Sequence, residues 1–489
     1  MARGAVWMIL FKWVERGLGL VSTLILVRLL SPADFGMVSM ALSFIFMAEL
    51  LSAFSFDIAL IQNQAVTDEH YHSAWTANIM LGGFISVLML GLALPISHFY
   101  KQPAVFPVIC ALSLGPLLGS LENIGIVAFR RNLDFRREFI FQVSRKIIAT
   151  SVTIPLALAL HSYWALVAGI LASKAGGTAM SYWVQAFRPR LSFKEVGSLM
   201  SFSRWLLLNN FVNFLKERST DFVIGRFFGP GPLGMYNVNN EFASMASNEM
   251  GQPINRALLP GFAKLAGDEK AISRTFANAA GMVAVLAVPA AAGIFAVAPY
   301  LVPVVLGAKW LPGVPVMEVL SLNSALVVFQ GTIVTALVAT GNPFAATSTN
   351  VLFVALLLAG MFLLTGRFGP LGAAFAVFAA CAATTPVFLW QLKRHARVPV
   401  SNFFRVTVRP ALASAAMIAA VRWALPAYVP GMGSARAGLL LACGVGMGVL
   451  VYACAMLALW TSMGRPDGAE KQVFSRLKSR VPAWMPIPG

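Results

Sequence analysis

Apolar stretches of about twenty residues recur along the whole 489-residue chain, and they restrict it to one class of structure. Hydrophobic residues make up 58% of the chain and charged residues only 11%, with a mean hydropathy of +0.75. So few charges cannot cover the surface of a soluble protein, in which roughly a quarter of the residues are charged. Alternating strands of about ten residues, typical of a membrane β-barrel, are absent from the sequence. The pattern therefore predicts an all-α, polytopic membrane protein.

Fourteen of these stretches are long enough to cross a bilayer as helices. They lie near residues 5–27, 37–59, 74–97, 104–128, 141–160, 163–186, 204–225, 235–256, 276–297, 313–338, 344–365, 370–392, 408–426 and 437–460. No loop between them is long enough to form a separate soluble domain, so we expect the protein to act within or beside the bilayer.

The basic residues are distributed unequally between alternate loops. If the N-terminus is cytoplasmic, most of the 37 Lys and Arg residues fall in cytoplasmic loops and in the tail after Thr461. The opposite loops hold about six, and this asymmetry predicts fourteen spans with both termini in the cytoplasm. The loop 62–72 departs from the rule, since it should be cytoplasmic but has no Lys or Arg. The same rule accounts for the net charge of +18 without nucleic acid as a partner.

An internal repeat relates the two halves of the chain. A shift of 198 residues aligns 7–37 with 205–235 without a gap, and seven positions coincide. These include an Arg, a Pro and a Gly in each copy: Arg28, Pro32 and Gly36 in the first, Arg226, Pro230 and Gly234 in the second. Because the shift contains an even number of spans, both copies enter the membrane in the same direction. We therefore predict two parallel six-helix lobes, 1–195 and 196–400, followed by two further helices and a basic tail, 401–489.

Polar residues occur at helical spacing on the first helix of each lobe. Lys12, Glu15, Arg16 and Gly19 share one helix face, and the equivalent face of the second copy carries Asn209, Asn213, Lys216 or Glu217, and Thr220. A charge near the middle of the bilayer costs at least a few kcal/mol, and such residues usually face a wet cavity. Two copies of the face predict a shared central cavity. The alternative is that Lys12 and Arg16 reach the cytoplasmic surface, with Glu15 paired to Arg16.

The eighth span carries a second polar pattern. Its amides, one hydroxyl and one carboxylate repeat at helical spacing: Asn237, Asn240, Glu241, Ser244, Asn248, Gln252 and Asn255. A continuous stripe of this kind suits the hydroxyl groups of a sugar, which need many neutral donors and acceptors. The alternative is that the stripe joins helices through interhelical hydrogen bonds.

Acidic residues inside the spans are candidates for binding a coupling proton or cation. Among them we single out Glu49, Asp57 and Asp221, because buried carboxylates can titrate near neutral pH. The alternative for each acid, and for Glu122, Glu249 and Glu318, is a structural ion pair. The sequence has no G-x-x-x-x-G-K-[ST], G-x-S-x-G or HExxH motif, and its histidines form no ligand cluster. We therefore predict no enzyme activity, no cofactor and no metal.

Four segments resemble a known family. They are "VRLLSPADFGMVSMA" (27–41), "FRRNLDFRREF" (129–139), "INRALLPGFAKL" (254–265) and "LGAKWLPGVPVMEVLSL" (306–322). In these segments the chain is similar to the Wzx-like polysaccharide flippases of the multidrug/oligosaccharidyl-lipid/polysaccharide exporter superfamily. The resemblance implies a V-shaped pair of six-helix lobes that moves a lipid-linked oligosaccharide from the cytoplasmic to the periplasmic face of the bacterial inner membrane. By position, the basic cavity residues of the family correspond to Lys12 and Arg16.

The residues and the resemblance together predict a flippase for polyprenyl-diphosphate-linked oligosaccharide in lipopolysaccharide or exopolysaccharide biosynthesis. We expect the diphosphate to bind Lys12, Arg16, Lys216 and Arg218. The glycan would bind Asn209, Asn213 and the stripe of the eighth span, while the lipid tail stays in the membrane. Polysaccharide polymerase and export components are candidate partners. The alternatives are a lipid II flippase, a drug/cation antiporter of the same superfamily, and a membrane-embedded polymerase or ligase.

Overall fold

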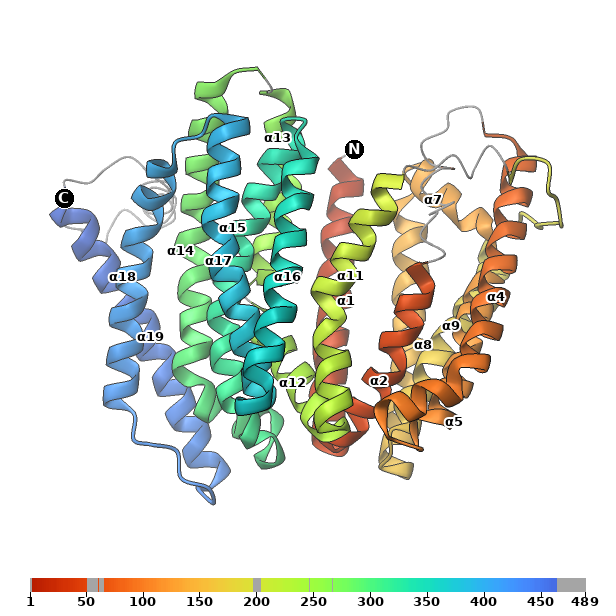
Figure 1. The fold of residues 1–489 in the computed structure, drawn as a ribbon, viewed down its shortest axis with the longest axis horizontal. Coiled ribbons are helices and arrows are strands. Elements are labelled where there is room, and N and C mark those ends of the chain that lie inside the picture. Colours follow the sequence, from red (N-terminus) through yellow and green to blue (C-terminus); the bar gives the residue numbers. More distant parts are fainter. Residues whose placement is uncertain are drawn as a thin grey trace. The chain divides into compact units, whose positions relative to one another are not determined.

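The computed structural model describes residues 2–50, 60, 66–196, 204–245, 247–265 and 267–463, and these contain helices and loops but no strand. Figure 1 shows long helices running side by side within each part of the chain. Eight of the described helices are long and apolar enough to cross a membrane, or nine if the bent pair Val105–Ser120 and Ile124–Arg131 is one span. The prediction of an all-α, polytopic membrane protein is thereby confirmed, while the count of fourteen spans stays a prediction.

The chain divides into two compact units, Met1–Met235 and Tyr236–Gly489. The N-terminal unit contains α1 (Ala2–Leu29), α2 (Pro32–Glu49), α4 (Asp68–Tyr100), α5 (Val105–Leu112), α6 (Leu114–Ser120), α7 (Val127–Arg131), α8 (Phe135–Leu160), α9 (Trp164–Val184) and α11 (Arg204–Phe228). In this unit α1 packs on α8, α8 packs on α9, and α4 packs on α5 and α6. The helices α1 and α11 contain several charged residues, and for this reason neither is among the helices apolar enough to cross a membrane.

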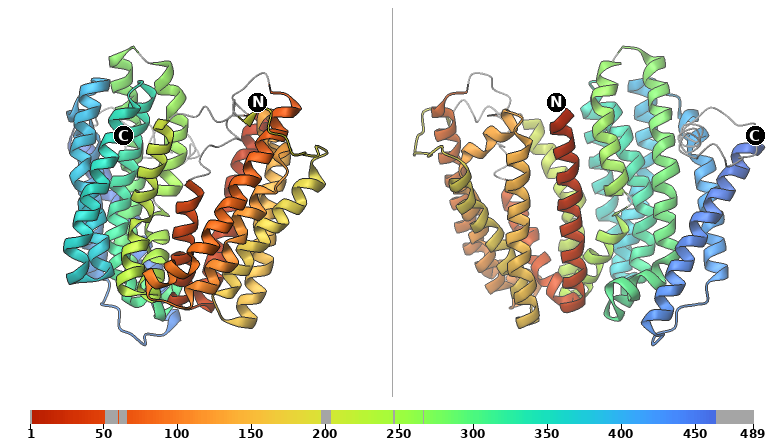
Figure 2. Two further views of the ribbon diagram at one scale, coloured as in Figure 1. Left: turned by 45° about the vertical axis from the view of Figure 1, so that its right-hand side comes forward. Right: turned by 180° about the vertical axis from the view of Figure 1, so that it is seen from behind.

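The C-terminal unit is built from long helices with small residues at their contacts. After α12 (Pro230–Ala243) come α13 (Gln252–Lys264), α14 (Glu269–Leu301), α15 (Val314–Ala339), α16 (Pro343–Phe368), α17 (Pro370–Ala396), α18 (Val400–Ala424) and α19 (Ser434–Ser462), which Figure 2 shows from two further sides. Buried alanines on α14 and α17 let neighbouring helix backbones approach closely. Gln330 of α15 donates hydrogen bonds to Thr384, Thr385 and the carbonyl of Cys381 on α17, which fixes the pairing of these helices.

The turn "SPAD" at residues 31–34 explains where α2 begins. Ser31 and Asp34 form a capping box: the Asp34 carboxylate accepts from the Ser31 amide at 2.8 Å, and the Ser31 hydroxyl accepts from the Asp34 amide at 3.3 Å. Pro32 occupies the first turn, where its missing N–H costs nothing. The second carboxylate oxygen of Asp34 accepts from the amide of Tyr163 at 2.9 Å, just before α9. The turn therefore starts one helix and anchors it to another.

The beginnings of α2 and α12 cross at a close contact that follows the internal repeat. A Cβ atom added to Gly36 would overlap the carbonyl oxygen of Pro230, and one added to Gly234 would overlap that of Pro32. The two contacts exchange under the shift of 198 residues that relates the copies. Only glycine permits such an approach, because any side chain would separate the two backbones. The Pro and Gly that coincide in the sequence thus meet each other in the structure.

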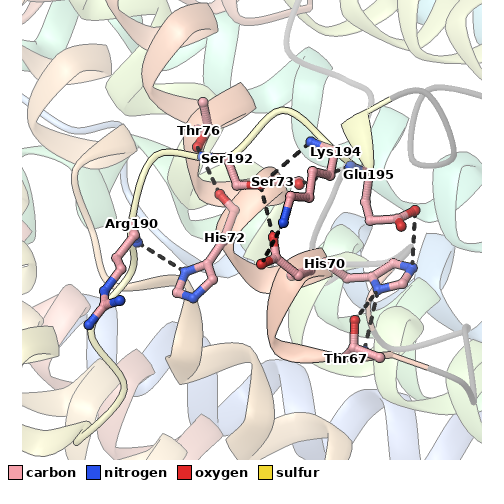
Figure 3. A network of polar contacts seen from close by, with 10 residues as sticks. Thr67, His70, His72, Ser73, Thr76, Arg190, Ser192, Lys194 and Glu195 are labelled. Carbon is pink, nitrogen blue, oxygen red and sulfur yellow. Dashed lines mark hydrogen bonds and ion pairs between the residues drawn. The ribbon is translucent and has the colours of Figure 1, made fainter.

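The chain segment after α9 is hydrogen-bonded to the first turns of α4 (Figure 3). Backbone amides of this segment donate to side chains of α4: Arg190 to His72 at 3.0 Å, Ser192 to Thr76 at 2.9 Å and Glu195 to Ser73 at 3.1 Å. The hydroxyl of Ser192 also donates to the carboxylate of Glu69 at 2.9 Å. Because amides from three positions are held in this way, the connection towards α11 belongs to the N-terminal unit as far as Glu195.

The contact between α2 and α12 can be tested with alanine substitutions. We expect Gly36→Ala and Gly234→Ala each to destabilise the protein by about 1–3 kcal/mol, because a methyl group is forced against backbone. Gly231→Ala is the matched control on the same turn, since nothing lies within 4 Å of its added Cβ. Thermal unfolding of the purified variants provides the measurement. Equal midpoints for Gly36→Ala and Gly231→Ala would show that the contact does not exist.

Candidate functional site

A cavity of about 420 Å³ lies inside the N-terminal unit, where α2, α4, α6, α8 and α9 come together. Four charged side chains line it: Glu49 on α2, Glu122 after α6, Arg145 on α8 and Lys174 on α9. Asn78 of α4 adds an amide. Charged groups within such apolar helices are costly and mark sites of binding or transport more often than sites of simple packing. This charged cavity is therefore a candidate functional site.

Two opposite charges in the cavity form a direct ion pair, which we call the closed pair. The guanidinium of Arg145 lies 3.2 Å from the carboxylate of Glu122, and their side chains are only 23% and 17% exposed. Gly177 of α9 makes the space for this pair, because a Cβ there would lie 2.8 Å from Nε of Arg145. The pair therefore joins α8 to the chain that follows α6, and each charge stabilises the other away from bulk water.

The second pair of opposite charges is open. The ammonium of Lys174 lies over Gly119 of α6, where an added Cβ would be 3.4 Å away. Lys174 attracts the carboxylate of Glu49, but the two groups form no direct ion pair in the described part of the chain. Because the two charges do not touch, water can lie between them, and protonation of the carboxylate would change the net charge of the pair. Glu49, which we predict as a coupling residue, therefore has a cationic neighbour that the sequence did not reveal.

On α11, two predicted site residues are partners of each other. Arg218 lies 3.2 Å from Asp221, one turn further along, and its guanidinium stacks over the ring of Phe46 on α2 at 4.5 Å. The Asp221 side chain is 3% exposed and that of Arg218 is 35% exposed. Arg218 thus keeps one side towards solvent while its charge is balanced by Asp221. A diphosphate at Arg218 would have to share it with this carboxylate.

The basic face of α1 continues onto α8. Arg16 is partly buried on α1, and Gly19 follows on the same face. Lys146 of α8 reaches this point, since a Cβ on Gly19 would lie 3.8 Å from its Nζ atom. The side chain of Lys12, and all of Asp57, lie outside the described part of the chain. On α11, the predicted residues Asn209, Asn213 and Lys216 are partly buried.

The polar stripe of the eighth span is exposed at several positions. Asn237 and Ser244 are partly buried, whereas Asn240, Glu241 and Asn248 are exposed. Within the predicted span 235–256, α12 ends at Ala243 and a π-helical turn, Ser247–Gly251, precedes α13. Asn248 donates to the Ser244 hydroxyl at 3.2 Å.

The far end of this stripe joins helices. Asn255 on α13 accepts a hydrogen bond from the hydroxyl of Thr332 on α15 at 2.9 Å. At this position the structure supports interhelical hydrogen bonding, the alternative to sugar binding that the sequence left open.

Arg145, Lys146 and Lys174 are functional candidates that the sequence analysis did not single out. They lie within the predicted spans 141–160 and 163–186, and each approaches a glycine on a neighbouring helix. The sequence did contain a signal for these residues, because a Lys or Arg inside an apolar stretch is the same feature that pointed to Lys12 and Arg16. The glycine partners could not be identified without the structure, since they lie on other helices.

Breaking the ion pair between Glu122 and Arg145 should lower the stability of the protein. We expect Glu122→Gln to destabilise the protein by about 3 kcal/mol, because the Arg145 charge would stay buried without its partner. Lys194→Gln is the control for an exposed pair, Lys194 with Glu69, and should change stability by less than about 1 kcal/mol. Unfolding by heat or denaturant measures both. A similar small loss in the two variants would contradict the assignment of a structural ion pair.

The chain is similar to known proteins of polysaccharide biosynthesis. Residues 25–315 match the profile of the family described as "Polysaccharide biosynthesis protein". The chain is 26% identical over 474 residues to the succinoglycan biosynthesis transport protein ExoT of Rhizobium meliloti, covering 95% of this chain and 94% of that protein. It is 26% identical over 325 residues to the lipopolysaccharide biosynthesis protein WzxC of Escherichia coli, covering 65% of each.

Solved structures show the same fold. A lipid II flippase, MurJ, in an inward closed conformation superposes with a TM-score of 0.77 at 14% identity, covering 93% of this chain and 99% of that one. An inward-facing multidrug resistance transporter of the MATE family and MOP superfamily superposes with a TM-score of 0.53, also at 14% identity, covering 81% of this chain and 95% of that one. The family profile covers more than half of the chain, which therefore belongs to this family of polysaccharide biosynthesis proteins.

Proposed function

We propose that the protein is a flippase that moves a polyprenyl-diphosphate-linked oligosaccharide across the bacterial inner membrane by alternating access. The observation that carries the proposal is the set of Lys and Arg residues held inside the membrane helices of the N-terminal unit. A neutral lipid or an organic cation would gain nothing from such charges, whereas a diphosphate would. The relatives named as polysaccharide transport and biosynthesis proteins support the same substrate class.

The arrangement in the membrane is part of the proposal. We infer fourteen spans, two six-helix lobes at 1–195 and 196–400, and two additional helices with a basic tail at 401–489, with both termini in the cytoplasm. The asymmetry of Lys and Arg between loops supports this orientation. The crossing of α2 and α12 at equivalent glycines supports the internal repeat. We infer transport rather than catalysis, with polysaccharide polymerase or export components acting on the product.

Each part of the substrate has a matching set of side chains. Lys12, Arg16, Lys216 and Arg218 hold the diphosphate. The glycan contacts donors and acceptors on α11, on α12 and in the residues just after α12: Asn209, Asn213, Asn237, Asn240, Ser244 and Asn248, together with Glu241. A glycan can reach the exposed amides of this set, which supports their assignment as glycan contacts. The polyprenyl tail remains in lipid.

An ion gradient drives the cycle through carboxylates, of which Glu49 is the best supported. Its position in the charged cavity, opposite Lys174, lets its protonation change the balance of charge within the unit. Asp57 and Asp221 are the other candidates, and the pairing of Asp221 with Arg218 links it to the basic residue we assign to the substrate.

The diphosphate assignment predicts the effect of neutralising α1. Cells with Lys12→Gln and Arg16→Gln should accumulate lipid-linked oligosaccharide on the inner leaflet, as a deletion strain would, because each lost charged contact weakens binding by about 1.5–3 kcal/mol. The control is Lys270→Gln, an exposed residue of α14. Extraction of membrane lipids and blotting for protein abundance give the readout. Normal lipids with altered dye efflux would instead indicate a drug antiporter.

The coupling assignment predicts a different phenotype for Glu49. In vesicles with an imposed proton or sodium gradient, Glu49→Gln should bind substrate normally but lose the stimulation of transport by the gradient, since the amide cannot exchange a proton. Asp68→Asn, an exposed carboxylate at the start of α4, is the control and should retain the stimulation. If Glu49→Gln responds to the gradient as the wild type does, coupling runs through another residue.

A further inference from the structure

Two neighbouring cations on α8 have different surroundings. Arg145 points to α9 and is neutralised by Glu122 at 3.2 Å. Lys146 points to α1, where the position of a Cβ on Gly19 lies 3.8 Å from both its Cε and its Nζ atom. Consecutive residues of an α-helix point in directions about 100° apart, so the two charges lie on different faces of α8. Lys146 therefore does not belong to the charged cavity.

Lys146 has no ion pair or hydrogen bond with the residues that the structure describes. It is half-buried and lies five positions into the predicted span 141–160, which places it about 8 Å along that span. An ammonium at this depth costs free energy unless an anion or water compensates it. Its tip approaches the backbone of α1 at Gly19.

Gly19 brings Lys146 to the basic face of α1. Arg16 lies three positions before Gly19, and Lys12 four before that, so all three share one face of the helix. The Cβ position of Gly19 lies at van der Waals distance from the tip of Lys146, so α1 and α8 meet at this point. Two helices, α1 and α8, thus contribute cations to one wall of the N-terminal unit.

We propose that Lys146 binds the phosphate groups of the transported lipid together with Arg16, an assignment that rests on the proposed function and extends it to α8. A diphosphate carries two anionic groups, and two cations from different helices match it better than cations from one helix. The guanidinium binds one phosphate through its paired N–H donors, and the ammonium binds as a compact charge with three donors. Lys146 therefore distinguishes a lipid diphosphate from a lipid monophosphate.

The test compares two probes, polyprenyl diphosphate and polyprenyl monophosphate, both without a glycan. Their binding to the full-length protein is measured in phosphatidylcholine nanodiscs for the wild type, Lys146→Gln, Lys146→Arg and Arg16→Gln. We expect Lys146→Gln to raise the Kd for the diphosphate about tenfold and to leave that for the monophosphate nearly unchanged. Lys146→Arg should restore the preference for the diphosphate. Lys101→Gln, at the far end of α4, is the control for the loss of one positive charge.

A second variant tests the position rather than the charge. Gly19→Leu fills the space beside Lys146 and should weaken diphosphate binding while Lys146 itself is intact, whereas Gly17→Leu, with nothing within 4 Å of its added Cβ, should not. Unfolding midpoints of all variants show whether they are folded.

The outcomes separate this inference from the proposed function. If Arg16→Gln loses diphosphate binding and a folded Lys146→Gln does not, the role of Lys146 is wrong and the flippase assignment stands. If neither loses binding, the diphosphate assignment on α1 fails as well. If Lys146→Gln differs from the wild type only in nanodiscs that contain phosphatidylglycerol, Lys146 binds a bulk phospholipid head group, and the inference is overturned.

Discussion

The need to compensate charges inside apolar helices governs this structure. A lysine, arginine or carboxylate within a membrane span is stable only next to an opposite charge, water or a ligand. Several such groups are neutralised by partners on other segments, as Arg145 is by Glu122, and Glu318 of α15 by Arg422 of α18. Lys146 has no such partner among the described residues, and Lys174 attracts Glu49 without a direct ion pair in that part of the chain. The paired groups hold helices together, and we propose that the unpaired ones act in transport.

Glycine is the means by which these long side chains fit between helices. Gly177 makes room for Arg145, and the tips of Lys174 and Lys146 lie at van der Waals distance from the Cβ positions of Gly119 and Gly19. A different use of glycine occurs where α2 and α12 cross, at Gly36 and Gly234, because there the neighbouring backbone itself fills the space. The first use sets where charge lies within the N-terminal unit, and the second sets how closely the starts of the two repeated helix pairs approach.

Apolar periodicity was sufficient to predict the helical membrane class, since a helix must be apolar over about twenty residues to span lipid. The repeat identified Gly36, Pro32 and their equivalents, and the structure shows these residues in contact. Pairing between distant residues could not be predicted in this way. Arg218 and Asp221 were assigned separate roles although they neutralise each other.

The π-helical turn between α12 and α13 was not predicted. Its polar residues keep helical spacing across the π-helical turn, so their pattern in the sequence looks continuous.

The central claim is that basic residues inside the N-terminal unit let this chain carry a lipid diphosphate across a membrane. It is tested most directly with purified protein in vesicles that contain a fluorescent polyprenyl-diphosphate-linked oligosaccharide and an external, membrane-impermeant quencher. We predict that the wild type makes the inner-leaflet pool accessible to the quencher, and that a folded Arg16→Gln, Lys146→Gln double variant does so at least tenfold more slowly. Equal rates for the two proteins, or no exchange beyond that of empty vesicles, would contradict the account.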